Sequence, residues 1–181
     1  MTNAHPNKTL SKIFCDSSAD LEFESSDEVV FKIHSKHLPS TSFGFVMGEG
    51  DRASESQPAQ LSESAEILEL LFQFVEPPSE SRHFQYPSLT ELDPAHFFTL
   101  AEAAEKYIVF ACMGMCATRM RFDTAMMEAH ALDVLNHSFK HGYNDLVLTS
   151  IWRTLQNCNF ELVAEKLTTP GLLAKWVRSQ L

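Results

Sequence analysis

The sequence is poor in cysteine, and no part of it is apolar over a long stretch. Only 4 of its 181 residues are cysteines, and no two of them form a CxxC pair. So few thiols, so far apart, do not make the disulfide framework of a small secreted domain. The first segment, MTNAHPNKTLSKIF, lacks the apolar run of a signal peptide, and no stretch reaches the ~18 apolar residues of a membrane span. We therefore expect an intracellular protein, cytoplasmic or nuclear.

Positive charge is scarce as well. The chain has 24 acidic and 14 basic residues, which gives a formal net charge of −10. Phosphate binding requires clustered Lys and Arg, so this balance argues against nucleic acid or a membrane surface as a partner. What the composition does contain is 44% hydrophobic residues, 14 Phe among them. That content is sufficient for a substantial buried core.

The motifs that signal catalysis or cofactor binding are missing too. The 6 glycines fit neither of the phosphate-binding patterns GxxxxGK[ST] and GxGxxG. A GxSxG nucleophile elbow does not occur either. These motifs therefore give no sign of catalysis, and we expect no cofactor.

Three residue pairs have a spacing that suits metal binding on a helix. His137 and His141 lie four residues apart, but a zinc protease helix has Glu after its first His, and here Ser138 follows. We interpret both histidines as surface residues. Cys112 and Cys116 share that spacing, and we expect them to be buried in the core.

The third pair is His34 and His37, three residues apart. Our preferred interpretation is that His34 begins a structural turn after a strand, and a weak metal pair is the alternative. The sequence shows no further ligand that would complete any of the three pairs. We therefore predict that there is no metal site.

Local patterns in the N-terminal part predict a small sheet. Residues 1–11 are polar and are expected to be a flexible tail. Apolar and polar residues alternate over 20–24 and 29–33 on both sides of a polar break, which predicts an antiparallel hairpin with one buried face. We expect two short helices separated by a break over 34–47, and an exposed loop over 48–60.

Helical periodicity dominates the rest of the chain. The first helix is capped by Ser62 or Ser64 and ends before Pro77-Pro78, and the second opens at its N-cap Asp93. The predicted helices cover residues 62–75, 94–107, about 109–120, 128–142 and 143–156, with a terminal helix that opens at Pro170. The fold class predicted from these patterns is α+β, with helices dominating.

Three segments, in this order, resemble motifs of the BTB (POZ) domain. The first is Phe31-Lys32-Ile33-His34, followed by Leu38 and by Ser42-Phe43-Gly44-Phe45. The second is ILELLFQFV at 67–75 and the third is FTLAEAAEKY at 98–107. Upstream, Ala19-Asp20-Leu21 is similar to the opening strand of the family. The chain as a whole resembles the stand-alone BTB proteins of mushroom-forming fungi.

The resemblance implies a helical cluster flanked by a short sheet in residues 12–122, with residues 123–181 as a C-terminal helical extension. It implies a non-enzymatic protein-interaction module that forms a homodimer or pairs with another BTB protein. The alternatives are an adaptor of a cullin-based ubiquitin ligase and a transcription-associated regulator. A small enzyme of unrecognised type is the least favoured alternative.

Family geometry implies where the contact surface lies. It combines the N-terminal segment, the opening strand and the first helix, and its residues are Ile13, Phe14, Asp20, Leu21, His34, Ser35, Leu38, Phe43 and Phe45. Two departures from the family pattern stand out. Many dimeric members carry a basic residue where this chain has Ser35, so Asp20 is expected to lack that partner. The segment Glu76-Pro77-Pro78 replaces the usual Tyr-Thr-Gly.

Overall fold

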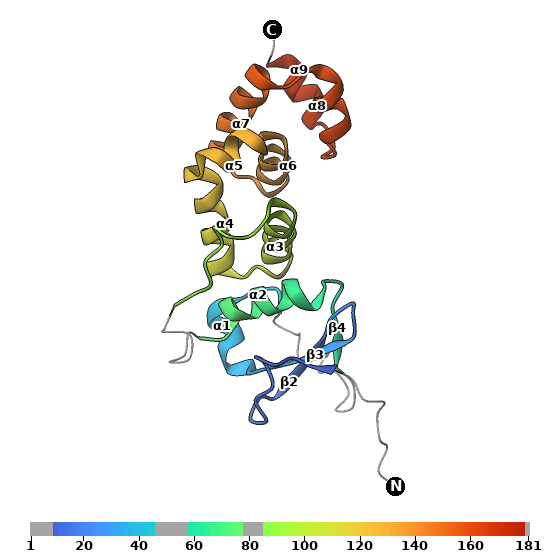
Figure 1. Cartoon of the computed structure of the whole chain (residues 1–181), viewed down its shortest axis with the longest axis vertical. Coiled ribbons are helices and arrows are strands. Elements are labelled where there is room, and N and C mark those ends of the chain that lie inside the picture. The colour runs from blue at the N-terminus through green and yellow to red at the C-terminus, as the bar shows by residue number, and fades with distance from the viewer. Residues whose placement is uncertain (1–8, 46–57, 78–84, 180–181) are drawn as a thin grey trace. The chain divides into compact units, whose positions relative to one another are not determined.

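The computed structural model describes residues 9–45, 58–77 and 85–179, which form helices and one small sheet (Figure 1). This is the α+β class predicted from the sequence. The chain divides into two compact units: unit 1 comprises residues 1–88 and 99–113, and unit 2 comprises residues 89–98 and 114–181. Within the described ranges, no helix combines the length and the apolar character that a bilayer crossing requires.

The sheet of unit 1 has four strands in the order β1-β3-β2-β4. Strands β2 and β3 are antiparallel and place Phe23 opposite Phe31, which confirms the predicted hairpin. The outer strands are parallel to their neighbours, β1 to β3 and β4 to β2. The strands are β1 (Thr9–Leu10), β2 (Leu21–Glu24), β3 (Val29–Ile33) and β4 (Ala59–Gln60).

The two outer strands were not predicted. Residues 9 and 10 belong to the sheet rather than to a flexible tail, and residues 59 and 60 belong to it rather than to a loop. The remainder of that tail, 1–8, and most of that loop lie outside the described residues. A strand of two residues is too short to show an alternating pattern. Hydrogen bonds to the longer neighbouring strands define it, and next to β1 the Ser11 N–H donates to the Val30 carbonyl at 2.8 Å.

The helices of the N-terminal half follow the predicted order. After His34 the chain forms a single-turn 3-10 helix, η1 (Ser35–His37), which runs directly into α1 (Leu38–Thr41). Helix α2 (Ala65–Val75) and helix α3 (Pro94–Tyr107) confirm the two clearest predictions, and α4 (Phe110–Phe122) follows. Ser42 pairs with Val109 as an isolated bridge instead of opening a second short helix.

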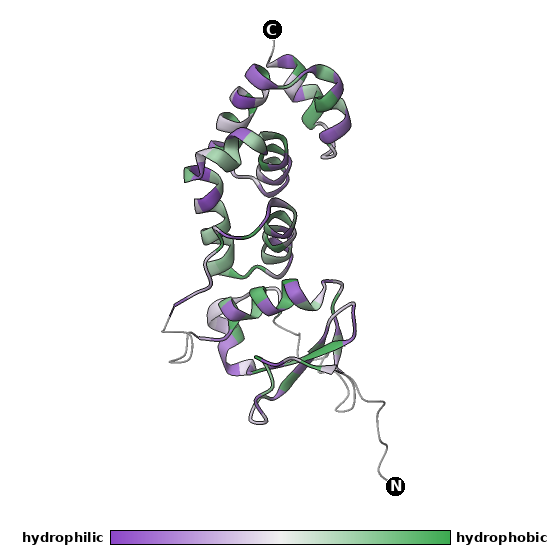
Figure 2. Cartoon of the chain, in the orientation of Figure 1, coloured by the Kyte–Doolittle hydropathy of each residue, from purple (hydrophilic) through white to green (hydrophobic). Residues whose placement is uncertain are grey.

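The core of unit 1 is a cluster of aromatic rings centred on Phe72 of α2. Helix α2 lies against the sheet, and hydrophobic residues mark both α2 and β3 (Figures 1 and 2). The ring of Phe72 lies 5.4–5.9 Å, centroid to centroid, from four other buried rings, those of Phe14, Phe23, Phe31 and Phe45. Phe72 is fully buried because it faces the sheet, where it contacts Phe23 and Phe31.

A polar contact from the hairpin fixes the start of α2. Asp27, in the turn between β2 and β3, accepts a 2.7 Å hydrogen bond from the backbone N–H of Ala65. Ser64, one of the two predicted caps, occupies the N-cap position, but its side chain makes no cap hydrogen bond, and the bond from Ala65 goes to Asp27, 38 positions away. Such a bond satisfies one of the free N–H groups at a helix start.

Unit 2 contains a helical hairpin and two shorter C-terminal helices. Helices α6 and α7 form the predicted hairpin, joined through Gly142, whose φ of 79° gives the left-handed conformation that ends α6. Its elements beyond α4 are α5 (Thr124–Ala129), α6 (Ala131–His141), α7 (Asn144–Asn157), α8 (Phe160–Lys166) and α9 (Leu172–Arg178).

The core of unit 2 surrounds Trp176. This indole is fully buried and donates a 2.8 Å hydrogen bond to Thr154 Oγ1 on α7. The terminal helix begins at Leu172 and not at Pro170, because Gly171, with φ of 78°, occupies the N-cap position. The other buried members of this core are Leu132, Leu135, Val163, Leu167 and Leu172.

Candidate functional site

All nine residues of the implied contact surface lie in unit 1, but they differ widely in exposure. Ile13 is 53% exposed and Phe43 is 68% exposed. Phe14, Leu38 and Phe45 are buried. Asp20 is exposed, and Leu21, His34 and Ser35 are half-buried. The exposed residues are therefore the ones that a partner can contact in this conformation, and their contact role stays a prediction.

The buried aromatic residues support the surface from inside. Phe14 packs against Phe31 and Phe72, with ring centroids 6.2 and 5.9 Å away. Phe45 stacks on Tyr107 at 4.3 Å with an interplanar angle of 6°. In the sequence Phe14 stands in a polar segment without a local partner. Its partners are distant in the chain, which is why periodicity did not place it in the core.

The sheet edge holds the N-terminal apolar residues in fixed positions. Leu10, in β1, is 43% exposed, and Ile13 follows it closely. Backbone bonds on both sides secure this segment: Ser11 N–H donates to Val30, and Lys32 N–H donates to the Phe14 carbonyl at 2.9 Å. Exposed apolar groups are thus presented on an ordered backbone at the edge of the sheet.

Phe43 sits where two distant segments of unit 1 approach closely. Its N–H donates to the Ile108 carbonyl at 3.1 Å, and the N–H of Gly44 donates to the Tyr107 carbonyl at 2.8 Å. A Cβ at position 44 would lie 2.5 Å from the Tyr107 backbone, so only glycine fits there. The Ser42 hydroxyl also donates to the Tyr107 carbonyl, at 2.6 Å.

Tyr107 is anchored at its other end by a carboxylate. Its hydroxyl donates to Glu63 Oε2 at 2.5 Å, and Lys106 Nζ lies 2.8 Å from Glu63 Oε1. Burial and the bond to Glu63 raise the pKa of Tyr107 to about 12. Burial opposes ionisation of Glu63, but the bonds from Lys106 and Tyr107 outweigh it and lower the pKa of Glu63. The Lys-Tyr pair of the third motif therefore has a structural role.

The Asp20 carboxylate is hydrogen-bonded to Ser35, the residue that stands in the place of the family's basic residue. Asp20 Oδ2 accepts from the Ser35 hydroxyl at 2.5 Å, and Oδ1 accepts from the Ser35 backbone N–H at 2.8 Å. These two bonds lower the pKa of Asp20. In the family pattern a basic residue lies beside this carboxylate. Here the Ser35 hydroxyl binds it instead.

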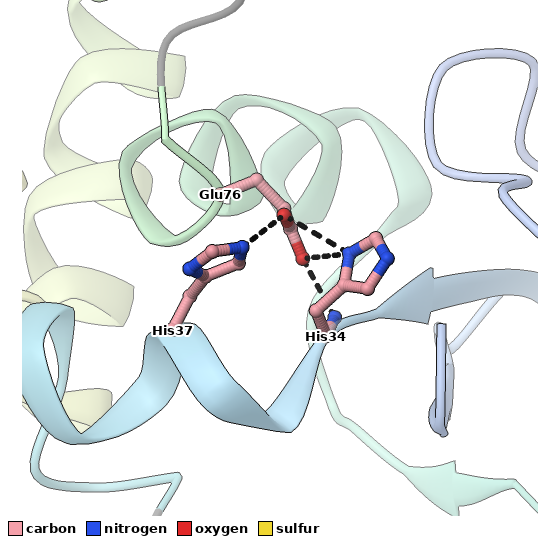
Figure 3. A group of neighbouring side chains, drawn as sticks. All are labelled: His34, His37 and Glu76. Atoms are coloured by element: carbon pink, nitrogen blue, oxygen red, sulfur yellow. Dashed lines mark hydrogen bonds and ion pairs between the residues drawn. The ribbon is translucent and has the colours of Figure 1, made fainter. Parts of the chain in front are cut away.

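His34, His37 and Glu76 form a compact group of potential metal ligands in the described part of unit 1 (Figure 3). The Glu76 carboxylate lies between the two rings: Oε1 is 3.1 Å from His34 Nδ1, and Oε2 is 3.6 Å from His37 Nε2. Oε1 also accepts from the His34 backbone N–H at 2.6 Å. Sequence reasoning identified the two histidines as a possible pair but missed the third member, Glu76. The only sequence feature that drew attention to Glu76 was that Glu76-Pro77-Pro78 replaces the family's usual Tyr-Thr-Gly.

The far side of His34 continues this polar network. His34 Nε2 is 3.0 Å from Ser18 Oγ, and Ser18 Oγ donates to Asp16 Oδ1 at 2.9 Å. Bonds from the Ser18 backbone and hydroxyl lower the pKa of Asp16. Ser18, His34 and Glu76 therefore have the connectivity of a hydrolytic triad. The hydroxyl proton, however, points to the Asp16 carboxylate, the stronger acceptor, and not to the histidine that would act as base.

The remaining candidate ligands have mixed outcomes. Cys112 and Cys116 are buried, as predicted. His137 is 3% exposed and stacks on Tyr143 with centroids 6.0 Å apart, so the interpretation of it as a surface residue was wrong. Its position on the inner side of α6 explains the burial.

No protein-family model and no curated protein matches the sequence. The resemblance to the BTB family therefore depends on the three motifs alone.

Proposed function

We propose that the protein is a non-enzymatic interaction module with a BTB/POZ-like domain in residues 12–122, and that it self-associates through the N-terminal edge of its sheet. The observation that carries this proposal is the exposure of Ile13 and Leu10 on a segment whose backbone is hydrogen-bonded to β3. Ordered apolar groups at an exposed edge are typical of contact surfaces. A second copy is the simplest occupant, because a two-fold interface uses one self-complementary patch.

The test is a single substitution, Ile13→Asp, in the full chain. Deletion of residues 1–16 is a poor test, because it removes Phe14 from the core. In a dimer, the new carboxylate would be desolvated at the interface twice, once per copy. We expect wild type to sediment at twice the 20.4 kDa of one chain and Ile13→Asp to shift toward the monomer.

The matched control is Phe160→Asp, which alters an apolar residue of similar exposure, 55%, in unit 2. This variant should keep the mass of wild type. Equal dimerisation of wild type and Ile13→Asp would contradict the proposed surface, and a wild-type monomer would leave a different BTB protein as the partner.

A second candidate function is an adaptor that links a cullin to a target protein. Helix α7 favours it, because Leu148 and Trp152, four residues apart on one side of the helix, are 71% and 63% exposed. Exposed Trp is enriched among residues that dominate binding energy. Co-purification with a cullin, and loss of a bound target in Trp152→Ala, would support the adaptor over the simple dimer. A transcription-associated regulator remains the other specific version of the same module.

An enzymatic alternative would have to use Ser18, whose connectivity to His34 is that of a nucleophile. We expect a fluorophosphonate probe to leave Ser18 unlabelled, because its hydroxyl proton is directed to Asp16. Stoichiometric labelling of Ser18 that disappears in His34→Gln would instead establish a hydrolytic site.

The location we propose is intracellular. Each of the four cysteines, all of them described, is a free thiol, and Cys15 is exposed. Such thiols are kept reduced in the cytosol and nucleus. The net charge of −10 supports protein partners rather than nucleic acid or a membrane surface.

A further inference from the structure

We propose that His34, His37 and Glu76 bind a divalent transition-metal ion, with Zn²⁺ as the best fit. One ligand atom from each of these residues lies within 4.8 Å of the other two. The inference is independent of self-association. It also revises our sequence-based expectation that no metal site exists, because that expectation counted two ligands, and the third comes from the end of α2.

The backbone brings the two histidines to the same side. His34 precedes η1 and His37 ends it. His34 has an extended backbone and η1 turns the chain back after it, so that the ring centroids of the two histidines lie 5.7 Å apart. Figure 3 shows the two rings on either side of the Glu76 carboxylate, which reaches them from the opposite element. Three ligands therefore come from two segments that are 42 residues apart.

The distances suit a zinc ion. In a tetrahedral site with bonds of about 2.0–2.1 Å, two ligand atoms lie about 3.3–3.4 Å apart. Glu76 Oε2 is 3.3 Å from His34 Nδ1 and 3.6 Å from His37 Nε2. The other carboxylate oxygen, Oε1, is held by the His34 backbone N–H, which fixes the orientation of the carboxylate. One nitrogen of each ring lies within 4.8 Å of the other ring's, so the two rings must move closer together for all three ligands to reach one ion.

The groups behind His34 support the same conclusion. Ser18 Oγ donates a hydrogen bond to Asp16, so it can accept one from Nε2 of His34, which lies 3.0 Å away. An ion bound at Nδ1 would leave the proton on Nε2, where it can make this hydrogen bond to Ser18. Metal-bound histidines regularly donate their second N–H to an acceptor in this way.

The chemistry of the ligands selects the metal. Two imidazoles and one carboxylate match zinc and neighbouring transition ions better than Mg²⁺ or Ca²⁺, which prefer oxygen ligands. The three side chains are 13–25% exposed, so an ion can enter from solvent. Three protein ligands leave a fourth position for water or for a group of a partner.

The experiment is calorimetric titration of the metal-stripped full chain with ZnCl₂, in a Cys15→Ser background that removes the exposed thiol. We expect one equivalent of bound zinc. His37→Gln and Glu76→Gln should each weaken binding by at least the ~10–100-fold that is typical of losing an outer partner of a metal ligand. Ser18→Ala, which removes such a partner, should itself fall in that range, and MgCl₂ should not compete.

The matched control is His96→Gln, which removes a histidine that bonds to a carboxylate, Asp93, at another place. It should bind zinc like wild type. Should a ligand variant fail to fold, two-bond ¹H–¹⁵N spectra of the wild-type imidazoles give the answer. Zinc should shift Nδ1 of His34 and Nε2 of His37. The absence of saturable zinc binding, or binding that is unchanged in both His37→Gln and Glu76→Gln, would overturn the proposal.

Discussion

The contacts that stabilise each unit internally differ in how far apart their residues lie in the sequence. In unit 1, the contacts that fix each element join distant segments: Tyr107 with Glu63, Ala65 with Asp27, and His34 with Glu76 are all about 40 residues apart. In unit 2, helix starts are capped from within, by Asp123 for α5 and by Asn159 for α8. Its longer links span between 22 and 33 residues, as between Thr154 and Trp176 and between Asn136 and Thr169.

This difference affects which surface residues each unit presents to a partner. Long-range contacts in unit 1 hold polar and apolar groups of the surface in fixed positions, as the sheet edge holds Ile13. In unit 2 locally capped helices leave large apolar groups on the surface, among them Trp152 and Phe160. We therefore expect substitutions at the ordered edge of unit 1 to alter self-association, and substitutions of buried residues in unit 2 to alter the stability of that unit without changing self-association.

The largest effect is expected for Leu71→Ala, in α2 of unit 1. Leu71 is fully buried, and removal of such a side chain typically costs ~2–5 kcal/mol through lost contacts and a residual cavity. The free energy of unfolding, measured by urea titration followed by circular dichroism, should fall by that amount. A midpoint equal to that of wild type would mean that α2 does not form the core of unit 1.

Two glycine substitutions should act in opposite directions. Gly44→Ala forces a Cβ onto the Tyr107 backbone and should destabilise unit 1 by about 1–3 kcal/mol. Gly114→Ala, inside α4 with open space around the new Cβ, should stabilise by roughly 0.5–1 kcal/mol because alanine is the better helix former. Thermal unfolding of the two variants side by side checks both signs, and a neutral Gly44→Ala would disprove the close approach.

In unit 2, Thr154→Val should cost about 1–3 kcal/mol, because it leaves the buried indole N–H of Trp176 without its acceptor. Both tryptophans of the chain, Trp152 and Trp176, belong to unit 2. Their fluorescence therefore follows this unit during unfolding. If the fluorescence midpoint does not move, the hydrogen bond contributes nothing to the core.

The smallest effect concerns alkaline pH. The pKa of Tyr107 lies near 12, above the ordinary value of about 10, so the folded state favours the neutral phenol. The stability that this group contributes is complete below pH ~10 and is lost as the pH rises toward 12. Phenolate absorbance should show one late titration that is missing in Tyr107→Phe. Ionisation of all three tyrosines near pH 10 would contradict the bond to Glu63.

Most of the fold followed from local patterns in the sequence. Alternation predicted the hairpin, and the 3.6-residue period with proline boundaries predicted α2 and α3. These signals lie within about a dozen residues. The strands β1 and β4 escaped prediction because two residues carry no period, and only their hydrogen-bonded neighbours define them.

Less of the candidate site could be predicted. His34, His37 and Asp20 are visible in the sequence, but nothing local links Glu76 to the histidines or Ser35 to a carboxylate. Phe14 was predicted to lie on the surface because it stands in a mostly polar segment, while its ring partners lie in β3 and α2. Which of these residues become neighbours depends on contacts between distant segments, and a single sequence does not reveal such contacts.

The solution mass of the wild-type chain across a concentration series tests the central claim most directly. We predict that light scattering gives twice the 20.4 kDa of one chain at high micromolar concentration and falls toward that value on dilution. A stable dimer would bury ~1,200 Å² or more in total, which requires the apolar edge as well as charged groups. A constant mass of one chain over the whole series would contradict self-association.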